Sequence, residues 1–478
     1  MTNAEDLVST GIYGLDTILG GGLSRPSLVV LIGAPGAGKT VLASQIIFHA
    51  ARQGHRAIVF TSFSEGAEQY IQHMRSLTFF DAGLLSNGVQ VLTLASQLTA
   101  EDSLPSTAMA RLIRTSGANI VLLDGFQGAD PLLPGGQSMR AMLSALATQI
   151  RYLDVTILVT IAGEVRDPHL YTEMTVADAA IGMVYRTEGR YHRRLLEVVK
   201  LRGRAQWPGL HSYQIDAQGV RVFPRIEGFL PARPQQFSDA RVPFELPVLD
   251  HLLGGGPNVG TTTLLAGAPG VGKTMLGLYW AVANARPEAA SLFISFAEQP
   301  DQLELKAAAF GLDLRGAVAR GSVRLLRLSA VELNPDRFAG ILLDELAEQK
   351  VARLVVDDVA SLLHELGERT RDYLSALSDI TYSAQITSMY MIEIAPFDGL
   401  RVNLSNTPTS VLGDNVLVIQ QYEIGGALRR VLGVLRMRLS IFDRTLYELV
   451  LDSAGIHLAP LEDTVQRRLA PGGSPTTT

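Results

Sequence analysis

The chain has 478 residues, of which 47% are hydrophobic and 18% are charged, and this length predicts at least two folded domains. The absence of cysteine excludes disulfides, thiolate zinc sites and iron–sulfur clusters, and it agrees with a reducing, cytoplasmic location. The net charge of −6 gives no basic footprint for nucleic acid, and no run of about 18 apolar residues predicts a membrane span.

A glycine-rich loop follows the first long predicted strand. Residues 27–33 (SLVVLIG) form an apolar, β-rich run, and residues 41–54 have the apolar spacing of a helix. Between them, GAPGAGKT matches GxxxxGK[ST], in which backbone N–H groups surround phosphates, lysine neutralises their oxygens and a hydroxyl binds Mg²⁺. The predicted ATP-binding residues are Gly33, Ala34, Pro35, Gly36, Ala37, Gly38, Lys39 and Thr40.

Acidic residues follow the next two predicted strands. Glu65 ends the segment AIVFTSFSE and is a candidate for the group that orients or deprotonates water, although a helix N-terminus also favours an acid. Asp124 ends IVLLD at 120–124, where a carboxylate would complete the Mg²⁺ shell with Thr40. A simple turn residue is the alternative for Asp124.

A basic block follows at 193–204 (RRLLEVVKLRGR), and it contains Lys200 and Arg202. A cation near the γ-phosphate would stabilise the charge that develops during phosphoryl transfer. A charged strand edge that prevents unwanted strand pairing is the other interpretation, and the residues alone leave both open.

The second half of the chain repeats six blocks in the same order. Its phosphate loop, GAPGVGKT, consists of Gly267, Ala268, Pro269, Gly270, Val271, Gly272, Lys273 and Thr274. The residues that correspond to those above are Glu298, Asp357, Arg436 and Arg438. Because the order agrees throughout, we interpret the chain as a tandem duplication of one domain. The recurrence of Asp124 as Asp357 favours their interpretation as Mg²⁺ ligands over that as turn residues.

The duplication predicts two α/β domains of one design. Apolar strands that alternate with helical patterns predict mainly parallel sheets covered by helices on both faces. The segment LPARPQQFS combines prolines with polar residues and predicts a linker. We therefore place a first domain at 1–230, a linker at 231–240, a second domain at 241–462 and a flexible C-terminal peptide at 463–478.

The tandem phosphate loops, a GLDxxLGGG segment, an F-x-E segment and a KLRG block resemble the KaiC family of circadian-clock ATPases and autokinases. The resemblance extends from about Ser9 to Thr476 and implies two tandem RecA-like domains stacked as a double ring. It further implies ATP and Mg²⁺, a homo-hexamer with ATP at subunit interfaces, and a Lys-x-Arg pair that reaches the neighbour's γ-phosphate. Clock-type partner proteins are expected at the C-terminal peptide VQRRLAPGGSPT or at the first-domain ring.

The sequence departs from this family at the acids that precede Glu65 and Glu298. The family's first glutamate, which resembles a catalytic base, is replaced by Ser64 in the first half and by Ala297 in the second. Either Glu65 and Glu298 substitute for it, or turnover is slow.

Two further departures concern the second half. The family's adjacent Ser-Thr phosphoacceptors correspond to Ser410 and Val411, which leaves Ser410 as the candidate acceptor. Arg436 replaces the family's lysine, and a planar guanidinium is not equivalent to an ammonium.

Four functions are compatible with these patterns. The first is an ATP-hydrolysing, ring-forming protein, and the second is a serine autokinase. The third is a nucleotide-binding scaffold without catalysis, which the missing acids favour. The fourth is a DNA-dependent ATPase of the RecA/RadA type, which the acidic charge and the 6% aromatic content disfavour. We favour the first.

Overall fold

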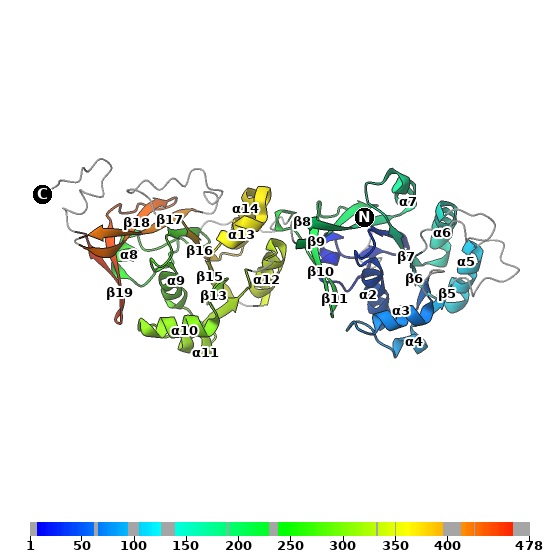
Figure 1. Cartoon of the computed structure of the whole chain (residues 1–478), viewed down its shortest axis with the longest axis horizontal. Helices are drawn as coiled ribbons and strands as arrows, with labels where there is room; N and C mark the ends of the chain where they lie inside the picture. The colour runs from blue at the N-terminus through cyan, green and yellow to red at the C-terminus, as the bar shows by residue number, and fades with distance from the viewer. Residues whose placement is uncertain are drawn as a thin grey trace. The chain divides into compact units, whose positions relative to one another are not determined.

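The computed structural model describes residues 7–61, 66–93, 105–125, 139–188, 191–228, 238–330, 333–348, 350–394, 413–424 and 426–461. The chain divides into two units, Met1–Gly228 and Phe229–Thr478, which Figure 1 colours from blue to red along the sequence. Most of the predicted linker and the whole predicted C-terminal peptide lie outside the described residues, so these domain limits stay predictions.

The first unit contains a large sheet and a small two-stranded one. Its strands are β1 (Leu7–Val8), β2 (Leu23–Ser24), β3 (Ser27–Gly33), β4 (Ala57–Thr61), β5 (Val89–Thr93), β6 (Ile120–Leu123), β7 (Thr156–Ala162), β8 (Ala179–Glu188), β9 (Tyr191–Leu201), β10 (His211–Asp216) and β11 (Gly219–Phe223). Its α-helices are α1 (Leu15–Ile18), α2 (Lys39–Arg52), α3 (Ala67–Met74), α4 (Leu84–Asn87), α5 (Pro105–Ser116), α6 (Met139–Leu153) and α7 (Tyr171–Val176).

The second unit repeats this plan. Its strands are β12 (Thr262–Gly267), β13 (Ala290–Ser295), β14 (Val323–Arg327), β15 (Val351–Asp357), β16 (Thr387–Glu393), β17 (Asn415–Ile424), β18 (Ala427–Met437), β19 (Tyr447–Asp452) and β20 (Gly455–Pro460). Its α-helices are α8 (Pro247–Leu252), α9 (Lys273–Val282), α10 (Pro300–Ala309), α11 (Leu314–Ala319), α12 (Pro335–Glu348), α13 (Ala360–Leu366) and α14 (Thr370–Ser383).

Both large sheets have nine strands in the same spatial order. The first reads β11-β10-β9-β8-β3-β7-β6-β4-β5, and the second reads β20-β19-β18-β17-β12-β16-β15-β13-β14 from the corresponding edge. Six neighbouring strands in each sheet run parallel, and antiparallel hairpins extend one edge. This arrangement confirms the predicted α/β fold of two tandem RecA-like domains.

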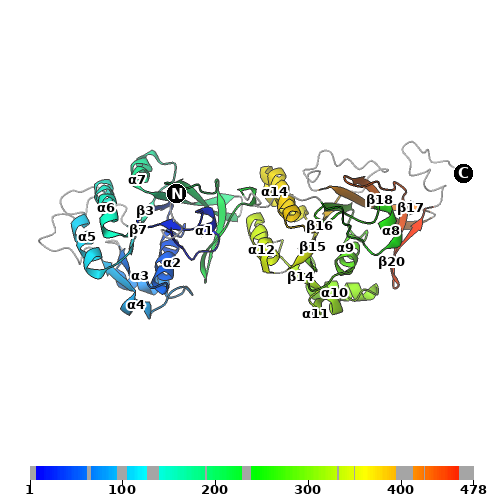
Figure 2. The same ribbon diagram turned by 180° about the vertical axis from the view of Figure 1, so that it is seen from behind.

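Helices cover both faces of each sheet, because successive side chains of the central strands point to opposite sides. In β3, Val29 and Leu31 join the core beneath α2, whereas Leu28, Val30 and Ile32 join the core beneath α5 and α6. Figure 2 shows the same layering in the second unit, where α9 lies on one side of β15 and β16 and α12 and α14 lie on the other. Among the described helices, none is long and apolar enough to cross a membrane.

Candidate functional site

Each glycine-rich loop joins the central strand of its sheet to the first long helix. β3 ends at Gly33 and α2 begins at Lys39, and in the second unit β12 ends at Gly267 and α9 begins at Lys273. The loops therefore place the N-terminal N–H groups of a helix beside the carboxyl ends of parallel strands, where anions bind in this class of fold.

The glycines of the loop are required by backbone geometry and by close packing. Gly38 and Gly272, which precede the lysines, have φ angles of 94° and 104°, which L side chains rarely adopt. A Cβ on Gly33 would lie 2.4 Å from the carbonyl oxygen of Met183, and one on Gly267 would meet Ile419 O at 2.5 Å. A side chain at either strand end would thus collide with the backbone of the neighbouring strand.

Both lysines fold back onto their own loops. Lys39 Nζ donates to the carbonyl oxygens of Gly33 and Ala34 at 2.7 and 3.1 Å, and Lys273 Nζ donates to the corresponding oxygens at 2.9 Å each. Burial lowers the pKa of both ammonium groups, and nearby carboxylates partly oppose that shift. A phosphate oxygen would add a charge-assisted partner to each ammonium.

The structure brings together the residues that the sequence predicts to bind Mg²⁺. Thr40 Oγ1 donates to the carboxylate of Asp124, 3.0 Å from each oxygen, and Thr274 Oγ1 lies 2.7 Å from Asp357 Oδ2. Asp124 is buried and also accepts a 2.7 Å hydrogen bond from Thr160. A hydroxyl beside a carboxylate is a hard-oxygen donor set that fits Mg²⁺ held jointly with phosphate oxygens.

The surroundings of Asp357 are unfavourable for its charge. Burial raises the pKa of its carboxyl group to about 6, and the hydrogen bond from Thr274 only partly offsets this effect. The carboxylates of Asp358 and Glu298 contribute to this raised pKa, and Lys273 opposes it. A cation bound beside Asp357 would favour the ionised form of its carboxyl group.

Glu298 lines a cavity beside the phosphate loop of the second unit, and it is held by an ion pair. This cavity has a volume of about 500 Å³ and is lined by Lys273, Thr274 and Glu298, among others. Glu298 Oε1 lies 2.5 Å from Lys306 Nζ of α10. Glu65, its counterpart in the first half, lies outside the described residues, as does the candidate phosphoacceptor Ser410.

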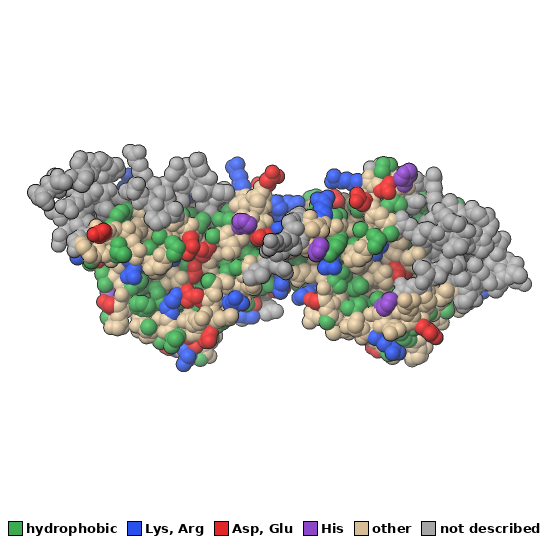
Figure 3. Space-filling model, in the orientation of Figure 1, with side chains coloured by type: hydrophobic (Ala, Val, Ile, Leu, Met, Phe, Trp, Pro, Cys, Tyr) green, Lys and Arg blue, Asp and Glu red, His purple; other side chains and the backbone are tan. Residues whose placement is uncertain are grey.

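Two further carboxylates line this cavity and were missed in the reading of the sequence: Asp358 and Glu393. Figure 3 shows acidic side chains gathered over the part of the second unit where Figure 1 labels α9, β15 and β16. Asp358 follows Asp357 directly, and Glu393 ends the next strand of the sheet. A comparison of the strand ends in the two halves, TIA against MIE, would have identified Glu393.

The first basic pair contacts helix α7 rather than the phosphate loop of its own unit. Lys200 Nζ donates to the carbonyl oxygens of Met174 and Thr175 at 2.9 and 2.8 Å, and Arg202 donates to the Thr175 carbonyl at 3.0 Å. Burial lowers the pKa of Lys200. The side chain of Arg202 remains 55% exposed.

Asp178 ties this basic pair to the strand that leads into the phosphate loop. Its Oδ2 accepts a 3.0 Å hydrogen bond from the backbone of Leu28 in β3, and its Oδ1 lies 3.3 Å from Arg202. One carboxylate thus holds the beginning of β3 and the exposed cation together.

The second unit repeats this connection. Asp414 Oδ2 accepts a 3.1 Å hydrogen bond from the backbone of Thr262 in β12, and its Oδ1 lies 3.1 Å from Arg438, which is 62% exposed. Arg436 donates to the carbonyl oxygen of Gly413. The pair Arg436 and Arg438 therefore occupies the same place in its unit as Lys200 and Arg202.

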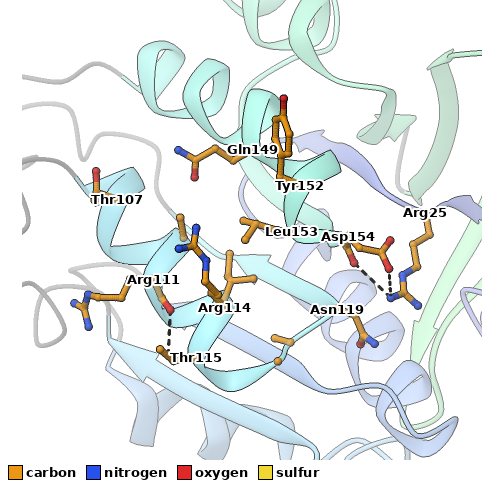
Figure 4. Close-up of a pocket in the computed structure, with 14 residues that line it drawn as sticks. Arg25, Thr107, Arg111, Arg114, Thr115, Asn119, Gln149, Tyr152, Leu153 and Asp154 are labelled. Atoms are coloured by element: carbon orange, nitrogen blue, oxygen red, sulfur yellow. Dashed lines mark hydrogen bonds and ion pairs between the residues drawn. The ribbon is translucent and has the colours of Figure 1, made fainter.

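A larger cleft lies elsewhere in the first unit and lacks the features of a nucleotide site. It measures about 990 Å³ and is bordered by α5, by the C-terminal part of α6 and by the Arg25–Asp154 ion pair, as Figure 4 shows. Its lining includes Arg111 and Arg114 but no glycine-rich loop that leads into a helix N-terminus. The nucleotide site is therefore assigned by its donor groups and not by cavity size.

The comparisons with known proteins agree with this geometry. The family model described as "ATPase: KaiC" matches the chain twice, at residues 8–227 and 242–463. The circadian clock oscillator protein KaiC of Picosynechococcus sp. is 24% identical over 98% of this chain and 92% of its own length. That of Thermostichus vulcanus is 25% identical over 94% of this chain and 88% of its own length.

Proposed function

The chain belongs to the KaiC ATPase family, and on this premise we propose that it hydrolyses ATP at both phosphate loops as a nucleotide-dependent homo-hexamer. The observation that carries the proposal is the recurrence of one set of groups in both units. Each set has a loop lysine, a helix N-terminus, and a hydroxyl within 3.0 Å of a carboxylate.

In each site, the residues of the chain would bind and orient ATP. Lys39 and Lys273 would exchange their loop carbonyls for β- and γ-phosphate oxygens. Mg²⁺ supplies neutralisation of the phosphate charge, and Thr40 with Asp124, or Thr274 with Asp357, would hold it. The N-terminal N–H groups of α2 and α9 would surround the phosphates.

Assembly into a ring is supported by the position of the basic pairs. Arg202 and Arg438 are exposed and are anchored away from the phosphate loop of their own unit, so they suit a site on a neighbouring subunit. Light scattering after size-exclusion chromatography tests this assembly. We expect a mass near six chains with Mg²⁺–ATP, and a monomer under these conditions would contradict the proposal.

A nucleotide-binding scaffold with little catalysis is the second candidate, since Lys306 neutralises Glu298. Phosphate release by the native chain and by Lys39→Ala, Lys273→Ala and the double variant separates the two candidates. If phosphate release is lost only in the double variant, the chain is an ATPase with two active sites. If the native chain and both single variants release phosphate no faster than the double variant, the chain is a scaffold.

Phosphorylation of Ser410 is a further part of the proposal and rests on the family resemblance. Intact-mass measurement after incubation with Mg²⁺–ATP tests it, and the expected product is heavier by about 80 Da, the mass of one phosphoryl group. If the product also forms in Ser410→Ala, the acceptor is another residue.

The relatives are named as circadian clock oscillator proteins, and we extend a clock-type regulatory role to this chain. Partner proteins would bind the segment 463–478 or the first-domain ring. Comparison of the partners retained by the full chain and by a chain that ends at residue 462 distinguishes the two locations.

A further inference from the structure

Glu393 and Ala162 occupy the same position in the two repeats. Glu393 pairs with Gly267 in the parallel register of β16 and β12, and Ala162 pairs with Gly33 in that of β7 and β3. The next residue in each half donates its N–H to the carbonyl oxygen of the loop's first glycine, at 3.2 Å in both units. The second nucleotide site therefore has a carboxylate where the first has a methyl group.

The position of Glu393 is suited to the reacting end of a nucleotide. Its strand, β16, lies between β15, which ends at Asp357, and β12, which leads into the phosphate loop. Glu393 lines the cavity of about 500 Å³ together with Lys273 and Asp357. Among the carboxylates that raise the pKa of Lys273, Glu393 has the largest effect, although burial outweighs all of them. Glu393 is therefore close to the ammonium that would bind the terminal phosphates.

The other carboxylates of this cavity are engaged. Glu298 is paired with Lys306 at 2.5 Å, Asp357 accepts from Thr274 at 2.7 Å, and Asp358 accepts from the backbone of Ala360. Among the described residues, no hydrogen bond or ion pair holds the Glu393 side chain, which is exposed to the cavity. Its oxygens are therefore open to accept a hydrogen bond from a water in the cavity.

The described part of the chain contains no group of three or more histidine, aspartate or glutamate side chains arranged to hold a metal ion. A water beside the γ-phosphate is a partner from which a carboxylate at this position can accept a proton.

We propose that Glu393 activates the water that hydrolyses ATP in the second unit, an inference that rests on the proposed ATPase function. The water oxygen forms a bond to the γ-phosphorus, and the bond from that phosphorus to the β–γ bridging oxygen breaks. ADP leaves with the electron pair of that bond, and the proton of the water passes to the carboxylate of Glu393. The first unit has no such group at Ala162 and requires a different one.

The test isolates the second site with Lys39→Ala and then adds Glu393→Gln, which keeps the size of the side chain and removes the base. We expect kcat for phosphate release to fall by about a hundredfold, the usual contribution of a general base. Fluorescent-ATP binding should stay equal or become tighter, because a negative charge beside the phosphates is removed. Glu288→Gln is the control, since this exposed residue precedes the amino end of β13 and should leave both quantities unchanged.

A value of kcat within twofold of the Lys39→Ala parent would overturn the proposal, as would a loss of fluorescent-ATP binding that accounts for the whole effect. A large loss in Glu298→Gln alone would assign the role to Glu298 instead. If the Lys39→Ala parent binds ATP but releases no phosphate, the proposed hydrolysis at the second site fails together with this role. That outcome is recognised because turnover is already absent before Glu393 is changed.

Discussion

Thr274 Oγ1 donates a 2.7 Å hydrogen bond to Asp357 Oδ2, and this short contact joins the last residue of the second phosphate loop to a carboxylate whose pKa is raised to about 6. The ionised carboxylate of Asp357 is therefore unfavourable in the folded protein unless a cation binds beside it. The raised pKa of Asp357 therefore predicts how the stability of the protein changes with pH.

We expect Asp357 to destabilise the nucleotide-free protein above pH 6. Because its pKa is higher in the folded state than its usual value of 3.8, stability falls as the pH rises through this interval. Asp357→Asn should therefore raise the melting temperature at pH 7.5, and the advantage over the native chain should shrink as the pH falls towards 4. Calorimetry across this range measures the difference, and a pH-independent difference would contradict the assignment.

The same variant should weaken Mg²⁺-dependent binding of ATP. Removing one charged oxygen ligand should cost about tenfold or more in affinity at the second site. Titration of fluorescent ATP into Lys39→Ala, with and without Asp357→Asn and with Mg²⁺ or EDTA, measures the effect. Equal affinities with Mg²⁺ would show that Asp357 does not hold the cation.

The loop lysines should be needed for binding. Lys39→Ala and Lys273→Ala each remove a charge-assisted partner of the phosphates, and we expect about a 10- to 100-fold loss of ATP affinity at the altered site. Isothermal titration should then show one strong site in place of two. Lys350→Ala, at an exposed position, serves as the control and should retain both.

Two glycines of one loop should differ in their tolerance of alanine. Gly33→Ala places a Cβ 2.4 Å from a backbone oxygen, so β8 must move, whereas a Cβ on Gly36 meets nothing within 4 Å. Gly36→Ala should cost only the strain of its positive φ, about 1 to 2 kcal/mol. Gly33→Ala should lower the melting temperature further, and similar melting temperatures in scanning calorimetry would contradict the packing described here.

The basic pair should act on a neighbouring subunit. In a Lys273→Ala background, chains with Arg202→Ala and chains with Lys39→Ala should each be nearly inactive in ATP hydrolysis. Arg202→Ala should have this effect because a cation at the transferred phosphate raises kcat by about a thousandfold. Mixed rings should regain activity at about a quarter of the first-domain sites, where an intact loop meets an intact Arg202. Mixed chains as inactive as the separate ones would place Arg202 outside the neighbour's site.

The sequence predicted the parts of the fold that depend on local pattern and repetition. The loop motif identified Lys39 and Thr40, and the apolar strand before Asp124 placed that carboxylate at the correct edge of the sheet. Matching the two halves then transferred these assignments to the second unit.

The missed features depend on neighbours that are distant in the sequence. The ion pair of Glu298 with Lys306 forms because α10 packs beside the cavity, and the role of Asp178 appears only when β3 and β9 both flank β8. Glu393 escaped notice because a glutamate at a strand end has no motif of its own. The register of β16 against β12 shows that Glu393 lies beside the start of the phosphate loop.

Asp178 and Asp414 each connect the loop strand of their unit to an exposed arginine. Each holds the start of the strand that ends in a phosphate loop, and each also holds an arginine exposed to other molecules. In a closed ring, a strand that shifts when its loop fills would displace the cation offered to the next subunit. Binding of ATP at one site would then affect the next site in one direction around the ring, so ATP would bind cooperatively. Asp178→Ala should lower the Hill coefficient of this binding.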